Sequence, residues 1–359
     1  MSSHSQFRLL AERRFLPFFG TQALGAFNDN VYKNTLVILA TYHAAAYTTL
    51  RPELLTMLAG GLFILPFVLF SGLAGQLSDR FDKTRVMRVV KLGEVAIMLL
   101  AAVGFVLHSM AVLLGALFLM GAHSTFFAPA KYGLLPQVLT EDELIGGNAL
   151  LEMGTFVAIL AGTLLGGLLA GHDDLPVIIA TLIGIAALGL VFSLAMPPLK
   201  AVAPGLRIDA NLWRSTRENL AAAGANRVVF LAVLGISWFW FYGILVLAQV
   251  PLYAKQIING NESVVTLLLA AFSLGVGTGS LLCERLSGRR LEIGLVPLGS
   301  LGLTLFGIDL FLASPAEPLA TTADWWRLLG HGWAWRVLAD VVLIGVSGGL
   351  YIVPLYAQM

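Results

Sequence analysis

Apolar residues along the chain gather in long runs that are separated by short polar segments. A helix that crosses the hydrocarbon core of a membrane needs about 20 mostly apolar residues. Ten runs approach or exceed that length, and they predict an all-α polytopic membrane protein. The predicted spans are 15–39, 54–77, 86–107, 110–128, 149–170, 175–196, 228–251, 263–283, 293–313 and 337–357.

The first run is broken in its middle by the polar stretch FNDNVYKN. A lone Asp or Lys at the centre of a spanning helix costs about 2.5–3.5 kcal/mol on insertion scales, so such residues are expected to face a bundle interior or a water-filled cavity. Asp29 and Lys33 are four positions apart and share one helix face. Two explanations remain open: a buried ion pair that holds the first helix to its neighbours, or a binding site on a cavity.

Composition supports the membrane class and excludes several functions. Hydrophobic residues make up 58% of the 359 positions and charged residues 12%, against about 25% charged residues in ordinary soluble domains. The net charge of +1 gives no basis for nucleic acid as a partner. The single cysteine, Cys283, excludes an internal disulfide and a multi-cysteine metal site. The glycine-rich runs lack the GK[ST] ending of a phosphate-binding loop, so we expect neither metal nor cofactor.

Lysine and arginine are unevenly distributed between the two sides of the predicted membrane. With the N-terminus in the cytoplasm, inner segments carry seventeen of them and outer segments four. Inner loops carry the excess of positive charge in membrane proteins, so the distribution predicts a cytoplasmic N-terminus.

An internal repeat divides the chain. The second span is followed by GQLSDRFDKTR and the eighth by SLLCERLSGRR, so the acid–arginine pair Asp79-Arg80 recurs 205 residues later as Glu284-Arg285. Repeats of this kind relate two halves by an axis along the membrane normal. We therefore expect a six-helix half over residues 1–196, a cytoplasmic linker over 197–227 and a second half over 228–359.

At these residues the whole chain resembles the major facilitator superfamily. The loop signature of that family, G-x-L-x-D-R-x-x-x-x-R, is matched by Gly75, Leu77, Asp79, Arg80 and Arg85. The family has twelve spans, so the resemblance implies a chain truncated after the tenth, with four of six helices in the second half. It also implies a gate at the inner ends of the halves, although the basic residues alone would serve as a topology signal. The gating residues implied are Gly75, Asp79, Arg80, Arg85, Glu284 and Arg285.

Four longer phrases resemble the bacterial lysophospholipid transporter family, and in particular its forms fused to acyltransferase domains. They are FNDNVYKN, FFAPAKYGLLPQVL, LIGGNALLEMGTF and ISWFWFYGILVLAQVPLYAK. The resemblance implies a flippase of the bacterial inner membrane that moves lysophospholipids such as lysophosphatidylethanolamine to the inner leaflet by alternating access. An acyltransferase, fused or separate, would reacylate them there. The alternative is an exporter of small amphiphiles or drugs. The chain has no H-x-x-x-x-D acyltransferase pattern, so we do not expect an enzyme.

Candidate substrate residues lie on the first, fourth and seventh spans, which line the central cavity in the resembled fold. Asp29 is expected to attract an ammonium headgroup and Lys33 a phosphate. Lys131 either binds phosphate or anchors its helix end, and His123 either binds or packs. The aromatic residues of the seventh span either form a wall for an acyl chain or pack. The full set is Asn28, Asp29, Asn30, Lys33, His123, Lys131, Tyr132, Trp238 and Gln249. Glu94 is expected to pair locally with Lys91, whereas Asp309 is expected to be a lone intramembrane acid.

Overall fold

The computed structural model describes residues 6–172, 174–209, 211, 214, 217–218, 221, 224–286 and 294–357. In this described part of the chain, long helices occupy all ten predicted spans. They are α1 (Leu16–Tyr42), α2 (Pro52–Arg80), α3 (Lys83–Val106), α4 (Met110–Val138), α5 (Glu141–His172), α6 (Leu175–Leu194), α8 (Arg227–Leu252), α9 (Glu262–Leu286), α10 (Leu295–Ala313) and α12 (Gly332–Ala357). Short helical segments are η1 (Gln6–Ala11), η2 (Ala44–Ala46), η3 (Tyr253–Ile258) and α11 (Trp325–Leu329).

Eight of the long helices in the described residues are long and apolar enough to cross a membrane by length and composition. The remaining two are α1 and α5. Helix α1 carries the polar stretch FNDNVYKN, and the apolar segment of α5 extends over Val157–Gly171. Polar side chains cap several starts: Asp82 accepts a hydrogen bond from the backbone N–H of Thr84 at α3, and Asn226 accepts from Val228 at α8. These caps satisfy backbone donors that the first helical turn leaves unpaired.

The helices of the first half pack around α1 and α4. Helix α1 packs against α5 and α6, and α4 packs against α2 and α3. Close approach of α1 and α5 depends on glycine, since a Cβ at Gly162 would lie 2.7 Å from the carbonyl oxygen of Phe27 and one at Gly166 2.7 Å from that of Val31. Small residues four apart allow helices to approach to backbone contact, as the sequence GTLLGGLLAG indicates.

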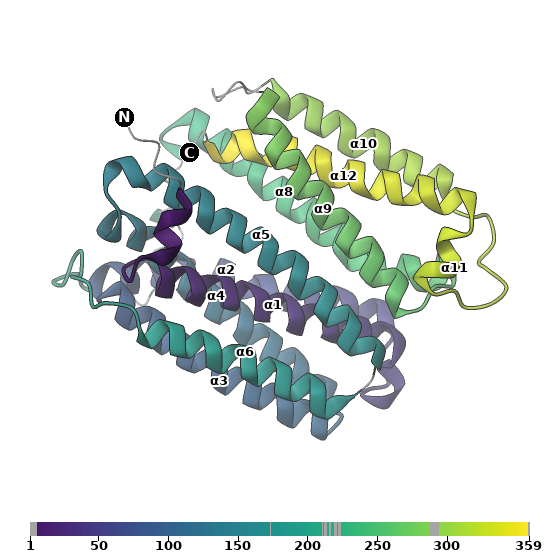
Figure 1. The fold of residues 1–359 in the computed structure, drawn as a ribbon, viewed down its shortest axis with the longest axis horizontal. Coiled ribbons are helices and arrows are strands. Elements are labelled where there is room, and N and C mark those ends of the chain that lie inside the picture. The colour runs from purple at the N-terminus through teal and green to yellow at the C-terminus, as the bar shows by residue number, and fades with distance from the viewer. Residues whose placement is uncertain are drawn as a thin grey trace.

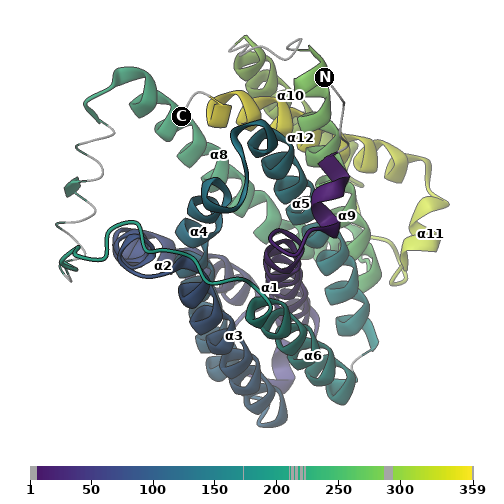
Figure 2. The ribbon, with the colours of Figure 1, turned by 60° about the vertical axis from the view of Figure 1, so that its left-hand side comes forward.

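The second half repeats part of this arrangement. Helix α12 packs against α9 and α10, as α4 does against α2 and α3. Gly275 and Gly279 of α9 face the carbonyl oxygens of Val342 and Val346 on α12. Figure 2 shows the bundle of α8, α9, α10 and α12 beside the bundle of α1 to α6. The repeat found in the sequence therefore corresponds to a repeated packing of helices.

The two halves are joined at the end of the bundle that lies away from both chain termini, which we call the distal end. Here α5 and α9 meet near α11 (Figure 1). Lys255 donates a hydrogen bond to the carbonyl oxygen of Thr41 at 2.5 Å, and Tyr42 donates to that of Gly260 at 2.8 Å. His43 Nε2 lies 3.2 Å from Glu262 Oε1. The other end carries Arg14, Arg80 and Arg85, and we call it the basic end.

The signature loop between α2 and α3 lies at the basic end and contacts the linker. The carbonyl oxygen of Asp79 accepts a hydrogen bond from the N–H of Ala203, and Gln76 Oε1 accepts one from that of Asp209. The carboxylate of Asp79 lies 3.5 Å from the ammonium of Lys83, which is buried. Arg80 lies over the ring of Phe81, Arg85 is exposed, and a Cβ at Gly75 would meet open space. The repeat counterparts Glu284 and Arg285 belong to α9, but their side chains lie outside the described residues, so the gate stays a prediction.

Candidate functional site

A cavity of about 520 Å³ lies between the two halves. It is within the range of 300–1,000 Å³ that is usual for small-molecule sites. The first half contributes residues from α1 to α5, and the second half contributes residues from α8 and α9. The cavity therefore lies where the sequence places a substrate path, between the halves.

The two halves line this cavity with different chemistry. Among the described residues, the charged and amide side chains of its lining all come from the first half: Gln22, Asp29, Asn30, Lys33, Asn34, Lys91, His123 and Lys131. The second half contributes mainly an apolar wall: Phe239, Trp240, Ile244, Leu247, Ala248, Pro251, Leu269, Phe272 and Val276. One end of a ligand can thus be held by charge and the other by apolar contact.

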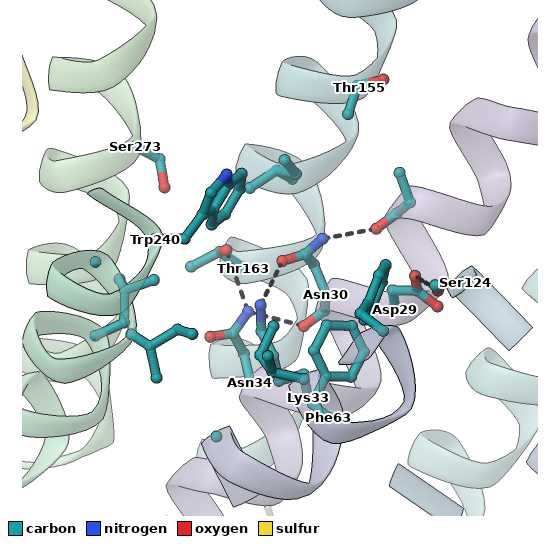
Figure 3. A pocket seen from close by; sticks show the side chains of 18 of the residues that line it. Asp29, Asn30, Lys33, Asn34, Phe63, Ser124, Thr155, Thr163, Trp240 and Ser273 are labelled. Atoms are coloured by element: carbon teal, nitrogen blue, oxygen red, sulfur yellow. Dashed lines mark hydrogen bonds between the residues drawn. The ribbon is translucent and has the colours of Figure 1, made fainter. Parts of the chain in front are cut away.

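The polar stretch of α1 provides the centre of the polar wall (Figure 3). The Lys33 ammonium donates a hydrogen bond to Asn30 Oδ1 at 3.2 Å and lies 5.5 Å from the centroid of the Phe63 ring. Asn34 donates to Thr163 on α5 at 3.2 Å. Asp29 Oδ2 accepts a hydrogen bond from Ser124 on α4 at 2.6 Å. Among the described residues Asp29 and Lys33 form no ion pair, although they lie one turn apart.

Next to the stretch of residues 29–34 lies a buried network that joins α1, α3 and α4 and includes the cavity-lining residues Lys91 and His123. Glu94 on α3 pairs with Lys91, which confirms the predicted local pair. Glu94 also accepts a hydrogen bond from Asn28 at 2.8 Å and lies 3.1 Å from His123 Nε2. Asn28, Lys91 and Glu94 are fully buried. The sequence indicated a local pair only, and the i, i+3 spacing gives no signal for the contacts to α1 and α4.

A second polar group lies on the cavity wall nearer the basic end. Lys131 donates to Thr155 on α5 at 3.1 Å, and Thr155 donates to Gln22 on α1 at 3.1 Å. The ammonium of Lys131 lies 5.1 Å from the Tyr132 ring centroid. Sequence reasoning selected Lys131 and Tyr132 but missed Gln22 and Thr155, because each is an ordinary polar residue within an apolar span.

The predicted site residues are partly brought together. Six of them line the cavity, namely Asp29, Asn30, Lys33, His123, Lys131 and Tyr132. Asn28 instead contacts Glu94. Trp238 is outside the lining and stacks on Tyr242, and Gln249 is exposed outside the cavity.

The tryptophan of α8 that lines the cavity, beside Phe239, is Trp240 rather than Trp238. Ile244, Ala248 and Pro251 follow Trp240 at intervals of three or four residues, and they also line the cavity. Residues three or four apart share a helix face, so this row is the face of α8 toward the cavity. The spacing of these residues is visible in the sequence. However, the aromatic residues of WFWFYG lie on several neighbouring faces of the helix, so the sequence does not show which face lines the cavity.

The expectation that Asp309 is a lone acid is wrong. Asp309 on α10 forms an ion pair with Arg336 at the start of α12, in which Arg336 Nε lies 3.1 Å from Oδ2. The pair could not be predicted from the sequence, because its two residues are 27 positions apart and lie on different helices. Asp309 therefore has a cation as its partner, and neither residue of this pair lines the cavity.

Comparison with known proteins gives consistent results. A sequence model of the family described as Major Facilitator Superfamily matches residues 18–359. The chain is 27% identical over 344 residues to proteins named lysophospholipid transporter LplT from Salmonella gallinarum and Salmonella typhimurium. The match covers 94% of this chain and 77% of each relative.

A solved structure shows the same fold. It is the nucleoside transporter NupG in a mutant form, with a TM-score of 0.63, 10% identity and coverage of 93% of this chain and 80% of that one. At this identity the likeness concerns the fold alone. The predicted absence of two last helices stays a prediction.

Proposed function

The chain belongs to the major facilitator superfamily, and from this premise we propose that it is a secondary transporter of lysophospholipids. The proposed substrates are lysolipids such as lysophosphatidylethanolamine, moved from the outer to the inner leaflet of the bacterial inner membrane. Similarity to the LplT proteins over 94% of the chain supports the substrate class. The relatives that match are transporters, and the chain is accordingly not itself an enzyme.

The observation that carries the proposal is the division of the cavity into a polar and an apolar wall. A lysophospholipid has a small charged headgroup and one long acyl chain. Charges of the first half suit the headgroup, and the aromatic and aliphatic residues of α8 and α9 suit the chain. The many hydroxyl groups of a sugar or nucleotide would find no hydrogen-bond partners on such an apolar wall. An acyl chain, by contrast, gains free energy when this wall buries it.

The separation of Asp29 and Lys33 supports a zwitterionic headgroup. Asp29 is held by Ser124 and Lys33 by Asn30, both of which are neutral partners. The two side chains make no direct ion pair with each other, so we propose that Asp29 attracts the ammonium of the headgroup and Lys33 its phosphate. Lys131 lies on the cavity wall nearer the basic end, and we propose that it is a second cation for the phosphate of the headgroup. We propose these as the headgroup contacts, with Asn30, His123 and Tyr132 beside them.

We propose a cytoplasmic N-terminus, which places the basic end inside and the distal end outside. The contacts of Lys255, Tyr42 and Glu262 then close the outer side, and they support our proposal that this conformation faces inward. Alternating access requires these contacts to break while the signature loop around Asp79 closes the inner side, as in a bistable gate. We further propose residues 1–196 and 228–359 as the two moving units and 197–227 as their linker. An acyltransferase, fused or separate, would consume the delivered lysolipid.

The test is uptake in spheroplasts that lack their own lysolipid transporter. Labelled lysophosphatidylethanolamine is supplied outside, and the reacylated product is measured with and without expression of the protein. We expect product to form only with the protein. Efflux of added amphiphiles without any lysolipid uptake would reject this proposal and favour an exporter of drugs.

A further inference from the structure

The first residues of the linker, 197–209, run along the signature loop between α2 and α3, and we call this segment the strap. Its contacts begin where the chain leaves α6. Thr84 Oγ1 donates a hydrogen bond to the carbonyl oxygen of Pro197 at 2.8 Å, and the N–H of Leu199 donates to Asp82 Oδ1 at 3.2 Å. The strap is therefore hydrogen-bonded to the start of α3.

The strap continues from there onto the end of α2. The N–H of Ala203 donates to the carbonyl oxygen of Asp79 at 2.8 Å. Gln76 binds the backbone of Asp209 with both ends of its amide: Oε1 accepts from the N–H at 2.7 Å, and Nε2 donates to the carbonyl oxygen at 3.5 Å. The residue number falls along the loop as it rises along the strap, so the two segments run antiparallel.

The strap supplies donors that the ends of these two helices need. Helix α2 ends at Arg80, and the last carbonyl groups of an α-helix have no partner within the helix. The carbonyl oxygen of Asp79 is one of them, and the N–H of Ala203 satisfies it. Asp82, which caps the start of α3, has a second oxygen-bound donor in Leu199. The signature loop and the strap are thus ordered together.

The end of α6, from which the strap starts, is fixed to α3 as well. Arg88 on α3 donates to the carbonyl oxygens of Ser193, Leu194 and Met196 at 3.2, 3.3 and 2.6 Å. Ser193 and Met196 are buried. The strap is therefore attached to the first half at its beginning by Arg88 and at its far end by the amide of Gln76.

We infer that the strap is part of the first moving unit and that Gln76 is a positioning residue, which acts by holding the strap on the signature loop. The inference rests on the proposed function for the movement of two halves. The strap binds backbone groups of the loop and leaves the side chains of Asp79 and Arg85 exposed, so they are available to the second half. During transport the strap stays bound, and the first moving unit extends to Asp209 instead of ending at residue 196.

The variant Gln76→Leu removes both hydrogen bonds to Asp209 and keeps a side chain of similar size. The maximal rate of lysophosphatidylethanolamine uptake should fall by about threefold or more, which is the size of effect that loss of an ordinary hydrogen bond has. The KM should not change, because the strap contributes no residue to the described lining of the cavity. Gln137→Leu is the matched control: this glutamine is exposed on α4 at the same basic end, and both parameters should stay at the wild-type level.

A cross-link tests whether the strap has to detach during transport. Gln76→Cys and Asp209→Cys are combined with Cys283→Ser, which removes the buried native thiol, and a short bifunctional thiol reagent joins the two new side chains. Before cross-linking we expect the slow uptake of Gln76→Leu, and after cross-linking recovery to at least half of the wild-type rate. Uptake that falls further on cross-linking would overturn the inference, because the strap would then have to be released. Wild-type uptake before cross-linking would also overturn it.

Backbone amide exchange on the purified full chain tests the strap without relying on transport. The amides of Leu199, Ala203 and Asp209 should exchange slowly in wild type and in Gln137→Leu, and those of Ala203 and Asp209 faster in Gln76→Leu. Exchange of the wild-type strap at the rate of an unfolded peptide would overturn the inference and leave the proposed function intact. Absence of lysolipid uptake by folded wild type would instead count against the proposed function, and amide exchange would still decide whether the strap is bound.

Discussion

Lys33 donates its hydrogen bond to Asn30 Oδ1 at 3.2 Å, whereas Asp29, one helical turn earlier on α1, accepts from Ser124 on α4 at 2.6 Å. Opposite charges four positions apart on a helix can pair, and here each takes a neutral partner instead. The polar stretch therefore presents two separate charges to the cavity. This arrangement fits a site for a zwitterion better than a structural ion pair.

Removal of either charge should impair transport much more than folding. Asp29→Asn keeps an oxygen that can accept from Ser124, and Lys33→Gln keeps a donor for Asn30. Hydrogen bonds to charged groups contribute about 1.5–3 kcal/mol, so we expect at least a tenfold loss of lysophosphatidylethanolamine uptake from each variant. Uptake in spheroplasts and melting in detergent measure the two effects.

Matched controls exist for both changes. Glu317→Gln and Lys200→Gln alter exposed residues of a connecting segment and of the linker, and they should leave uptake near the wild-type level. Wild-type uptake by Asp29→Asn and Lys33→Gln would exclude these residues from the headgroup site.

The buried pair of Lys91 and Glu94 should behave as a unit. Glu94→Gln leaves the Lys91 ammonium in the interior without its carboxylate, and breaking a buried pair in this way costs about 3–5 kcal/mol. The double variant Lys91→Met with Glu94→Leu removes both charges and should recover more than half of the loss. Thermal unfolding of wild type, Lys91→Met, Glu94→Leu and the double variant completes the cycle. A double variant as unstable as the two single effects added together would show that the pair is not coupled.

The helices could be predicted from the sequence because spanning segments must satisfy their own backbone and bury apolar surface in lipid. The position of the polar stretch on α1 also limited where the site could lie, since charges at mid-membrane need a cavity. The repeat of Asp79-Arg80 as Glu284-Arg285 indicated two related halves. These inferences depend on patterns local to one segment.

The partners of the polar residues could not be predicted, because they depend on how helices distant in sequence face one another. Nothing near Glu94 indicates that Asn28 and His123 lie beside it. For the same reason the sequence gives no sign that Asp309 pairs with Arg336. The sequence predicts Trp238 in the site, whereas Trp240 lines the cavity, because the rotation of α8 decides which of these two aromatic residues faces inward.

The ion pair of Arg14 and Glu143 ties the chain before α1 to the start of α5 and should respond to pH. Arg14 Nη2 lies 2.6 Å from Glu143 Oε1, and this hydrogen bond lowers the pKa of Glu143 from 4.5 to about 2. A lowered carboxyl pKa stabilises the fold above about pH 4.5, and this contribution disappears as the pH falls toward 2.

The variant Glu143→Gln should therefore lower the melting temperature by a constant amount between pH 5 and 7, and by less as the pH is reduced below 4.5. The pair is partly exposed, so the effect should stay below about 1 kcal/mol. Melting curves of Glu317→Gln over the same range provide the control. A difference that grows in acid would contradict this assignment.

Closure of the distal end should depend on Gly167, where α5 meets α9. A Cβ at this position would lie 1.8 Å from Thr266 Oγ1 and 2.7 Å from its Cβ, so Gly167→Val must push the halves apart there. Separation at the distal end favours the outward-open state, and uptake should fall several-fold. Thr56→Cys lines the cavity near this end, so it should react faster with an impermeant maleimide in the Gly167→Val variant.

The background for this labelling is Cys283→Ser, which removes the buried native thiol. Gly184→Val is the matched control, because a Cβ at Gly184 on α6 meets nothing within 4 Å. Equal labelling of Thr56→Cys with and without Gly167→Val would mean that this contact does not hold the distal end closed.

The apolar wall of α8 should determine which acyl chains the protein accepts. Ala248 lines the cavity between Ile244 and Pro251, and a phenyl ring at this position would occupy space that the proposal gives to the end of the chain. Ala248→Phe should therefore reduce uptake of 18-carbon lysolipids by about tenfold and that of 12-carbon lysolipids much less, since about 0.8 kcal/mol is lost per CH₂ that stays unburied. Leu245→Phe, on the exposed face of α8, should leave the chain-length profile unchanged. An equal loss for both chain lengths in Ala248→Phe would place the acyl chain elsewhere, because a ring that only distorts α8 affects every substrate alike.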